Sequence, residues 1–147
     1  MTDFAKIRGR TRIGEQFSRT LTLEAPDIAA IAIALGDANR LHLDEEYAKN
    51  SRYGGIIASG PHVSGVLLAL VATHFSQSGP VLGLEFALRF TAAARAGDTF
   101  TLAWEVTGIV DKPSLKGCIV DMQGSVSNQD GVKVLAATGK ALLTETL

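Results

Sequence analysis

Two side chains capable of acid–base chemistry, Asp37 and His42, stand near each other in a largely apolar part of the chain. A carboxylate beside an imidazole, partly shielded from water, can take a proton from a water molecule and deliver one to carbon. On a straight helix their spacing would place them about 140° apart, so they can converge only if their segment is a loop. In the alternative reading, Asp37 caps a helix end and His42 fills a surface niche, and spacing alone leaves both open.

A second candidate feature is the stretch 54–61, Gly-Gly-Ile-Ile-Ala-Ser-Gly-Pro, which leads into an apolar segment. Ser59 is a good helix cap and Pro61 suits a first helical turn, so a helix should begin here. The first turn of a buried helix offers unpaired N–H groups and a positive dipole end, which can hold a polarised carbonyl oxygen. Gly60 would let a ligand approach the backbone closely. An ordinary capped helix start explains the same residues.

The first half of the chain holds the elements that must position these residues. Residues 15–24 alternate loosely in polarity and predict a strand. A helix is predicted over residues 26–35 because proline suits its start and Gly36 its end. Residues 36–43 are predicted to form a loop and residues 44–50 a short helix. The helix from Pro61 to about Phe75 is apolar almost all round and therefore belongs in a core.

The second half changes character and predicts strands joined by turns. The runs 81–91, 99–110, 115–127 and 132–144 are rich in β-forming residues and partly alternate in polarity. Between them lie turn-forming sequences such as Ala96-Gly97-Asp98. Their spacing favours antiparallel hairpins, so the fold class is α+β, with one buried helix and an antiparallel sheet.

The composition limits the possible classes of protein. The chain has 147 residues, 46% hydrophobic and 20% charged, with a formal net charge of −1. A near-neutral balance of charge gives no reason to expect a nucleic-acid partner. We see neither an export signal nor an apolar run long enough to span a bilayer, and expect one cytoplasmic domain over residues 1–147. The mean hydropathy of +0.20 is high for such a chain and indicates a buried interface between subunits.

The stretch 37–48, Asp-Ala-Asn-Arg-Leu-His-Leu-Asp-Glu-Glu-Tyr-Ala, and the stretch 51–60 that follows it closely resemble the motif of the MaoC-like (R)-specific enoyl-CoA hydratases. Arg89-Phe90 through Gly97-Asp98 resembles a later strand and turn of the same family. The resemblance implies a single hotdog domain, in which an antiparallel sheet wraps round a long central helix. It also implies side-by-side pairing of two such domains, hence a homodimer or a higher homo-oligomer.

By this resemblance, Asp37 and His42 match the catalytic dyad, and Asn39 matches the residue that helps to orient it. Gly60 matches the glycine whose backbone N–H polarises the thioester carbonyl. The implied reaction is reversible syn addition of water to a trans-2-enoyl thioester, in fatty acid metabolism. It implies no metal and no redox cofactor, because coenzyme A or acyl carrier protein carries the substrate.

The chain departs from the family pattern at three positions. Arg40 and Ala93 stand where the family usually has proline, and Ser59 stands where it usually has histidine. Arg40 could lower the pKa of the neighbouring catalytic carboxyl group, contact a phosphate or carboxylate of the ligand, or remain a solvated surface residue. We count Arg40, Ser59 and Ser64 among the candidate substrate-binding residues, although a helical serine more often bonds to its own backbone.

Two other functions remain open on the sequence. A hotdog thioesterase would share the fold and the thioester grip, but the intact Asp–His pair argues against it. A non-catalytic acyl-CoA-binding or partner hotdog subunit is the other alternative, which the substitution at Arg40 could mark. His62 and His74 do not form a metal pair, and Cys118 is read as a buried structural thiol.

Overall fold

The computed structural model describes residues 1–147 and contains one antiparallel sheet in the strand order β1-β3-β4-β5-β2. Its strands are β1 (Gln16–Thr22), β2 (Val81–Phe90), β3 (Thr99–Lys112), β4 (Gly117–Ser127) and β5 (Lys133–Thr144). The helices are α1 (Phe4–Arg8), α2 (Ala25–Leu35), α3 (Arg40–Leu43), α4 (Glu45–Lys49) and α5 (Gly60–Ser76), with a 3₁₀ turn at Pro113–Leu115. The α+β class and the four predicted hairpin strands are confirmed.

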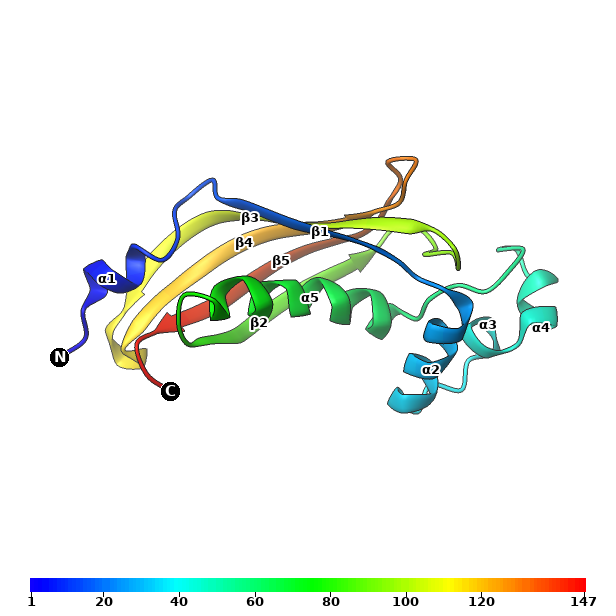
Figure 1. Ribbon diagram of the computed structural model, residues 1–147, viewed down its shortest axis with the longest axis horizontal. Helices are drawn as coiled ribbons and strands as arrows, with labels where there is room; N and C mark the ends of the chain where they lie inside the picture. The colour runs from blue at the N-terminus through cyan, green and yellow to red at the C-terminus, as the bar shows by residue number, and fades with distance from the viewer.

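The sheet curves over α5, which runs along its concave side (Figure 1). The helix turns the side chains of Val63, Leu67, Leu70, Val71 and Phe75 inward, where they join the strand residues in one hydrophobic core. This is the hotdog arrangement that the resemblance implies. The apolar helix is not wrapped on all sides within one chain, however, because Gly65, Ala69 and Ala72 on its outer side are exposed.

Trp104 of β3 fastens the central helix to the sheet. Its indole Nε1–H donates a hydrogen bond to the Leu67 carbonyl of α5 at 2.8 Å, and its side chain is almost completely buried. Room for the indole comes from Gly124, its register partner on β4, where an added Cβ would lie 2.5 Å from Trp104 Cε3. The position of α5, and of whatever its N-terminus binds, therefore depends on this large-and-small pairing.

The structure differs from the sequence-based expectation in two short segments. Residues 36–43 do not form an open loop throughout, because residues 40–43 make one helical turn, α3. The Asn39 side chain caps this turn by accepting a hydrogen bond from Leu41 N–H at 3.1 Å. The small helix α1, capped by Asp3, was not predicted from the sequence.

Three parts of the chain meet at the end of the molecule away from the two termini (Figure 1). They are the N-terminal end of α5, the α2–α4 segment, and the end of β2 with the loop that follows it. Both sequence motifs lie at this end. None of the helices is both long and apolar enough to span a membrane.

Candidate active site

Asp37 and His42 converge, as the acid–base interpretation requires. The distance between Asp37 Oδ2 and His42 Nε2 is 3.6 Å. Gly36 ends α2 in a left-handed conformation, and the α3 turn then brings His42 back towards Asp37, so the 140° separation of a straight helix does not apply. The second Asp37 oxygen, Oδ1, accepts a hydrogen bond from Asn39 N–H at 2.9 Å, which orients the carboxylate.

The backbone sets the orientation and the tautomer of His42. Its Nδ1 lies 2.7 Å from the Ile57 carbonyl oxygen, which can only accept, so Nδ1 carries the proton. In the neutral ring, Nε2 is then a bare acceptor facing a carboxylate oxygen, which is also an acceptor. Their separation is longer than a direct hydrogen bond and suits a group that donates to both. A water molecule has the two O–H bonds that such a site needs.

The N-terminus of α5 leaves one free N–H group. The Ser59 hydroxyl oxygen accepts from His62 N–H at 3.2 Å, and the Ser59 carbonyl accepts from Val63 N–H. Pro61 has no N–H, so the Gly60 N–H is the first-turn donor that no capping group takes. It points from the positive end of a 17-residue helix, where partial negative charge is stabilised.

His42 and Gly60 line one cleft with a volume of about 540 Å³. Most of its other walls are apolar, and part of one wall is the run of small side chains Ala92–Ala94. Asp37 is not a wall residue; its carboxylate reaches the site beside the His42 ring, which is itself only 6% exposed. A largely apolar cleft with a few convergent polar groups is the usual form of a small-molecule site.

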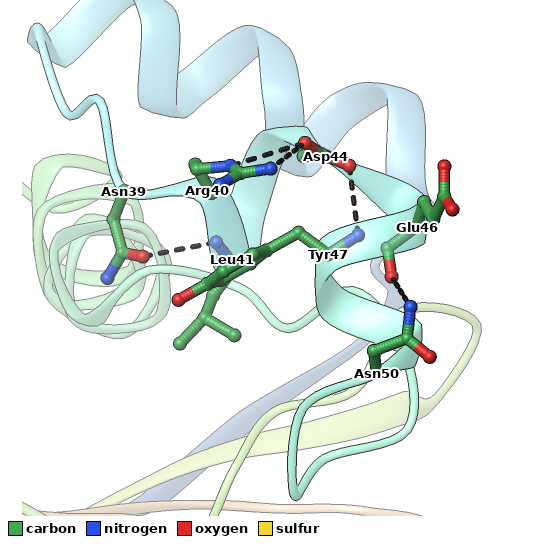
Figure 2. A network of polar contacts seen from close by, with 7 residues as sticks. All are labelled: Asn39, Arg40, Leu41, Asp44, Glu46, Tyr47 and Asn50. Carbon is green, nitrogen blue, oxygen red and sulfur yellow. Dashed lines mark hydrogen bonds and ion pairs between the residues drawn. The ribbon is translucent and has the colours of Figure 1, made fainter.

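Asn39 and Arg40 have different surroundings, although they are adjacent in the sequence. Asn39 lines the cleft and also caps α3. The Arg40 guanidinium instead turns to Asp44, with Nη2 at 2.9 Å from Oδ2, and lies over the Tyr47 ring at 4.2 Å from its centroid (Figure 2). The Tyr47 backbone N–H and then Arg40 lower the pKa of Asp44. The charge of Arg40 is thus engaged with Asp44, at an exposed site outside the cleft lining.

The two candidate serines serve the helix backbone. Ser59 is fully buried and acts as the predicted cap. The Ser64 hydroxyl donates to the Pro61 carbonyl at 3.2 Å, which is the local bond expected of a helical serine, and Ser64 is not part of the cleft lining. Neither residue is among those that line the cleft.

Cys118 and His62, two further titratable residues, lie outside the cleft lining. Cys118 is fully buried, and burial raises the pKa of its thiol to about 11, which suits the predicted structural role. His62 is buried, and its Nδ1 has no hydrogen-bond partner. Burial lowers the pKa of His62, whereas the negative charge of Asp27 partly opposes this shift. No group of three or more His, Cys, Asp or Glu side chains gathers as a potential metal site.

Tertiary structure adds residues that sequence reasoning did not single out. Tyr53, Phe90 and Val134 line the cleft from three separate segments. The Arg95 guanidinium donates a hydrogen bond to the Tyr53 carbonyl at the cleft end of the molecule. Lys112 and Lys116 flank the β3–β4 turn, which lies at the opposite end of the sheet (Figure 1). In the sequence, residues 89–98 stood out only through their resemblance to the family. That resemblance did not show which of these residues face the cleft.

Comparisons with known proteins show which family this chain resembles. The family model described as "MaoC like domain" matches residues 9–127. An (R)-specific enoyl-CoA hydratase from Rhodospirillum rubrum is 32% identical over 97 residues, covering 66% of this chain and 67% of that protein. A 3-hydroxybutyryl-CoA dehydratase from Methylorubrum extorquens is 30% identical over 88 residues, covering 60% of this chain and 55% of that protein.

Among solved structures, the (R)-hydratase from A. caviae involved in PHA biosynthesis superposes with a TM-score of 0.81 at 23% identity, covering 90% of this chain and 97% of that one. This likeness establishes the hotdog fold. The family match covers most of the residues, including Asp37, His42 and Gly60. The chain therefore belongs to the MaoC-like domain family.

Proposed function

We propose that the protein catalyses (R)-specific hydration of trans-2-enoyl-CoA to 3-hydroxyacyl-CoA, or the reverse dehydration. The observation that carries the proposal is the pair of acceptors, Asp37 Oδ2 and His42 Nε2, held 3.6 Å apart beside a cleft that Gly60, with its free N–H, also lines. Family membership and relatives that are named as a hydratase and a dehydratase support the same reaction.

In the proposed mechanism, water donates one O–H to Asp37 and one to His42. Its lone pair then faces the cleft, and the oxygen bonds to C3 of the substrate as one O–H breaks. The C2=C3 π electrons move towards the thioester carbonyl, and its oxygen, which gains negative charge, accepts a hydrogen bond from the Gly60 N–H. The dyad returns the proton to C2 on the face from which the oxygen came, so addition is syn and no net proton is consumed.

Coenzyme A enters this proposal as part of the substrate, and the steps above use only side chains and backbone of the chain. Four basic side chains are candidates for binding its phosphates: Arg89 and Arg95 are at the cleft end of the molecule, whereas Lys112 and Lys116 are at the other end. Arg40 is less suited to a ligand contact than its position in the sequence implied, because its guanidinium already forms an ion pair with Asp44.

The test is a hydration assay with crotonyl-CoA that follows loss of the enoyl thioester absorbance and determines the configuration of the product. Asp37→Asn should lower kcat by about 100-fold or more, since acid–base groups contribute about 10²–10⁴. Asp130→Asn, in an exposed turn, is the matched control. Release of free thiol would identify a thioesterase instead, and binding of acyl-CoA without turnover would identify the partner-subunit alternative.

The chain is also proposed to pair with a second copy along β2. This strand is at the sheet edge, pairs only with β5, and exposes Leu82, Leu84 and Leu88. Such an apolar edge next to the open face of α5 accounts for the high mean hydropathy. Sedimentation analysis at micromolar concentration should give a dimer or a multiple of one, and a monomer would contradict the pairing.

A further inference from the structure

Phe90 is a partly exposed aromatic residue in the lining of the cleft. It ends β2 and is 53% exposed, although it lines the same cleft as His42 and Gly60. Its backbone, by contrast, is well anchored: Phe90 pairs with Leu135, and the following Thr91 N–H donates to the Val134 carbonyl at 3.0 Å. The base of the side chain is thus fixed, and its surface is available for contact.

The tip of the Phe90 ring rests on Gly60. A Cβ placed on Gly60 would lie 3.0 Å from Phe90 Cζ and 3.4 Å from each Cε atom. A side chain at position 60 would therefore press against the tip of the ring, which would have to shift by a few tenths of an ångström. Gly60 does not have a positive φ, so this close approach, rather than an unusual turn, is the reason a glycine suits the position.

This contact places an apolar surface close to the free donor. The ring stands against the Gly60 Cα atom, and the Cα is bonded to the nitrogen whose N–H lacks an acceptor. A carbonyl oxygen that accepts this N–H would lie about 2.9 Å from the nitrogen. Carbons adjacent to that carbonyl must then pass beside the Phe90 ring, whereas atoms further along the acyl chain need not.

The remaining loop wall does not offer a comparable obstacle. Residues 92–94 are all alanine, and the chain has Ala93 where the family usually has proline. Small side chains leave room there, so bulk close to the carbonyl meets Phe90 first. The small side chains of this loop and the Phe90 ring beside Gly60 together predict a cleft that tolerates chain length more readily than branching at C2.

We propose that Phe90 is a specificity-determining residue that limits substitution at C2 of the acyl group. The inference rests on the proposed hydratase function, because it takes the Gly60 N–H as the site of the thioester carbonyl. The C2 hydrogen of an unbranched enoyl thioester fits beside the ring, and a C2 methyl group does not fit unless the ring is displaced.

The experiment compares kcat/KM for crotonyl-CoA, 2-methylcrotonyl-CoA and trans-2-hexenoyl-CoA in the wild type, Phe90→Leu and Phe90→Ala. The wild type should favour the unbranched substrates. Both variants should raise the ratio of 2-methylcrotonyl-CoA to crotonyl-CoA activity by about tenfold or more, as expected for one methyl group in an apolar pocket. The ratio of hexenoyl-CoA to crotonyl-CoA should stay within about twofold.

Val110→Ala is the matched control, since Val110 is a 58% exposed apolar strand residue at the far end of β3. It should leave all three ratios unchanged. Phe90→Leu retains an apolar side chain, so it keeps the comparison informative if Phe90→Ala folds poorly. A wild type that accepts the 2-methyl substrate as well as crotonyl-CoA, or variants that change all three substrates equally, would overturn the role of Phe90. Absence of hydration of every substrate would instead overturn the proposed function.

Discussion

Replacing Gly124 by alanine should destabilise the protein, although the same change at an open position should not. Glycine-to-alanine substitution restricts the unfolded chain and by itself stabilises by about 0.4–1 kcal/mol where the backbone permits it. At Gly124 the new Cβ would lie 2.5 Å from Trp104 Cε3, 2.6 Å from Cδ2 and 2.8 Å from Cζ3. Carbon atoms normally pack about 3.5–4.0 Å apart, so the overlap is about 1 Å.

The surroundings of Trp104 decide which effect is larger. The indole is 1% exposed and its Nε1–H is bonded to Leu67 O, so the ring cannot move aside freely. Overpacking of this kind costs about 1–3 kcal/mol, occasionally more. We expect a net loss of about 2 kcal/mol in the free energy of unfolding, which corresponds to a fall in Tm of about 4–8 °C for a chain of this size.

Thermal and urea unfolding measure this loss, with Gly55→Ala as the control. Gly55 has no positive φ and no atom within 4 Å of an added Cβ, so its substitution should be neutral or slightly stabilising. Trp104→Val removes the whole ring, including the three atoms that clash. The double variant should therefore be more stable than the sum of the two single changes by about 1 kcal/mol. Equal stabilities of Gly124→Ala and Gly55→Ala, or strict additivity in the double variant, would refute the packing argument.

Two further predictions concern stability. Arg10 donates to the carbonyls of Phe75, Pro80 and Thr144 and to the Ser78 hydroxyl, tying the end of α5 to β5. Arg10→Lys should lower the free energy of unfolding by about 2 kcal/mol, because one ammonium group cannot reach all four acceptors; an unchanged urea midpoint would contradict this. Burial lowers the pKa of His62 below its ordinary value of 6.5, while Asp27 of α2 opposes and His42 of α3 adds to the shift. The unfolded state therefore binds a proton more readily than the folded state, and stability should fall as the pH drops below about 6.5. In His62→Leu the decline in Tm between about pH 7 and 5 should be shallower, and an identical decline would exclude His62 as a contributor.

The sequence was most informative where local patterns decide the structure. Alternating polarity located all five strands within a few residues, and Pro26 with Gly36 marked the ends of α2. Ser59 and Pro61 likewise located the start of α5, because capping is a local interaction between neighbouring residues. The strand order was not predicted, since pairing of β1 with β3 and of β2 with β5 joins distant segments.

For the candidate site, Asp37, His42 and Gly60 were evident in the sequence. Their spacing alone did not exclude purely structural roles, such as capping a helix or lying at the surface. Tertiary structure placed Asp37 and His42 3.6 Å apart and used the Ile57 carbonyl to fix the His42 tautomer. The structure also shows that the Arg40 guanidinium bonds to Asp44 and that the Ser64 hydroxyl bonds to the backbone of its own helix. The neighbouring residues in the sequence could not reveal either contact.

Phe90 shows most clearly what only the tertiary structure decides. Its aromatic character is plain in the sequence, but the contact of its ring with Gly60 joins residues from the end of β2 and the start of α5. The sequence determined the five strands, the longer helices and which side chains have suitable chemistry, because propensity, capping and polarity act over a few residues. The curved sheet and the helix packed in it decided which of those side chains meet at the cleft, because long-range packing brings together groups that no local pattern relates.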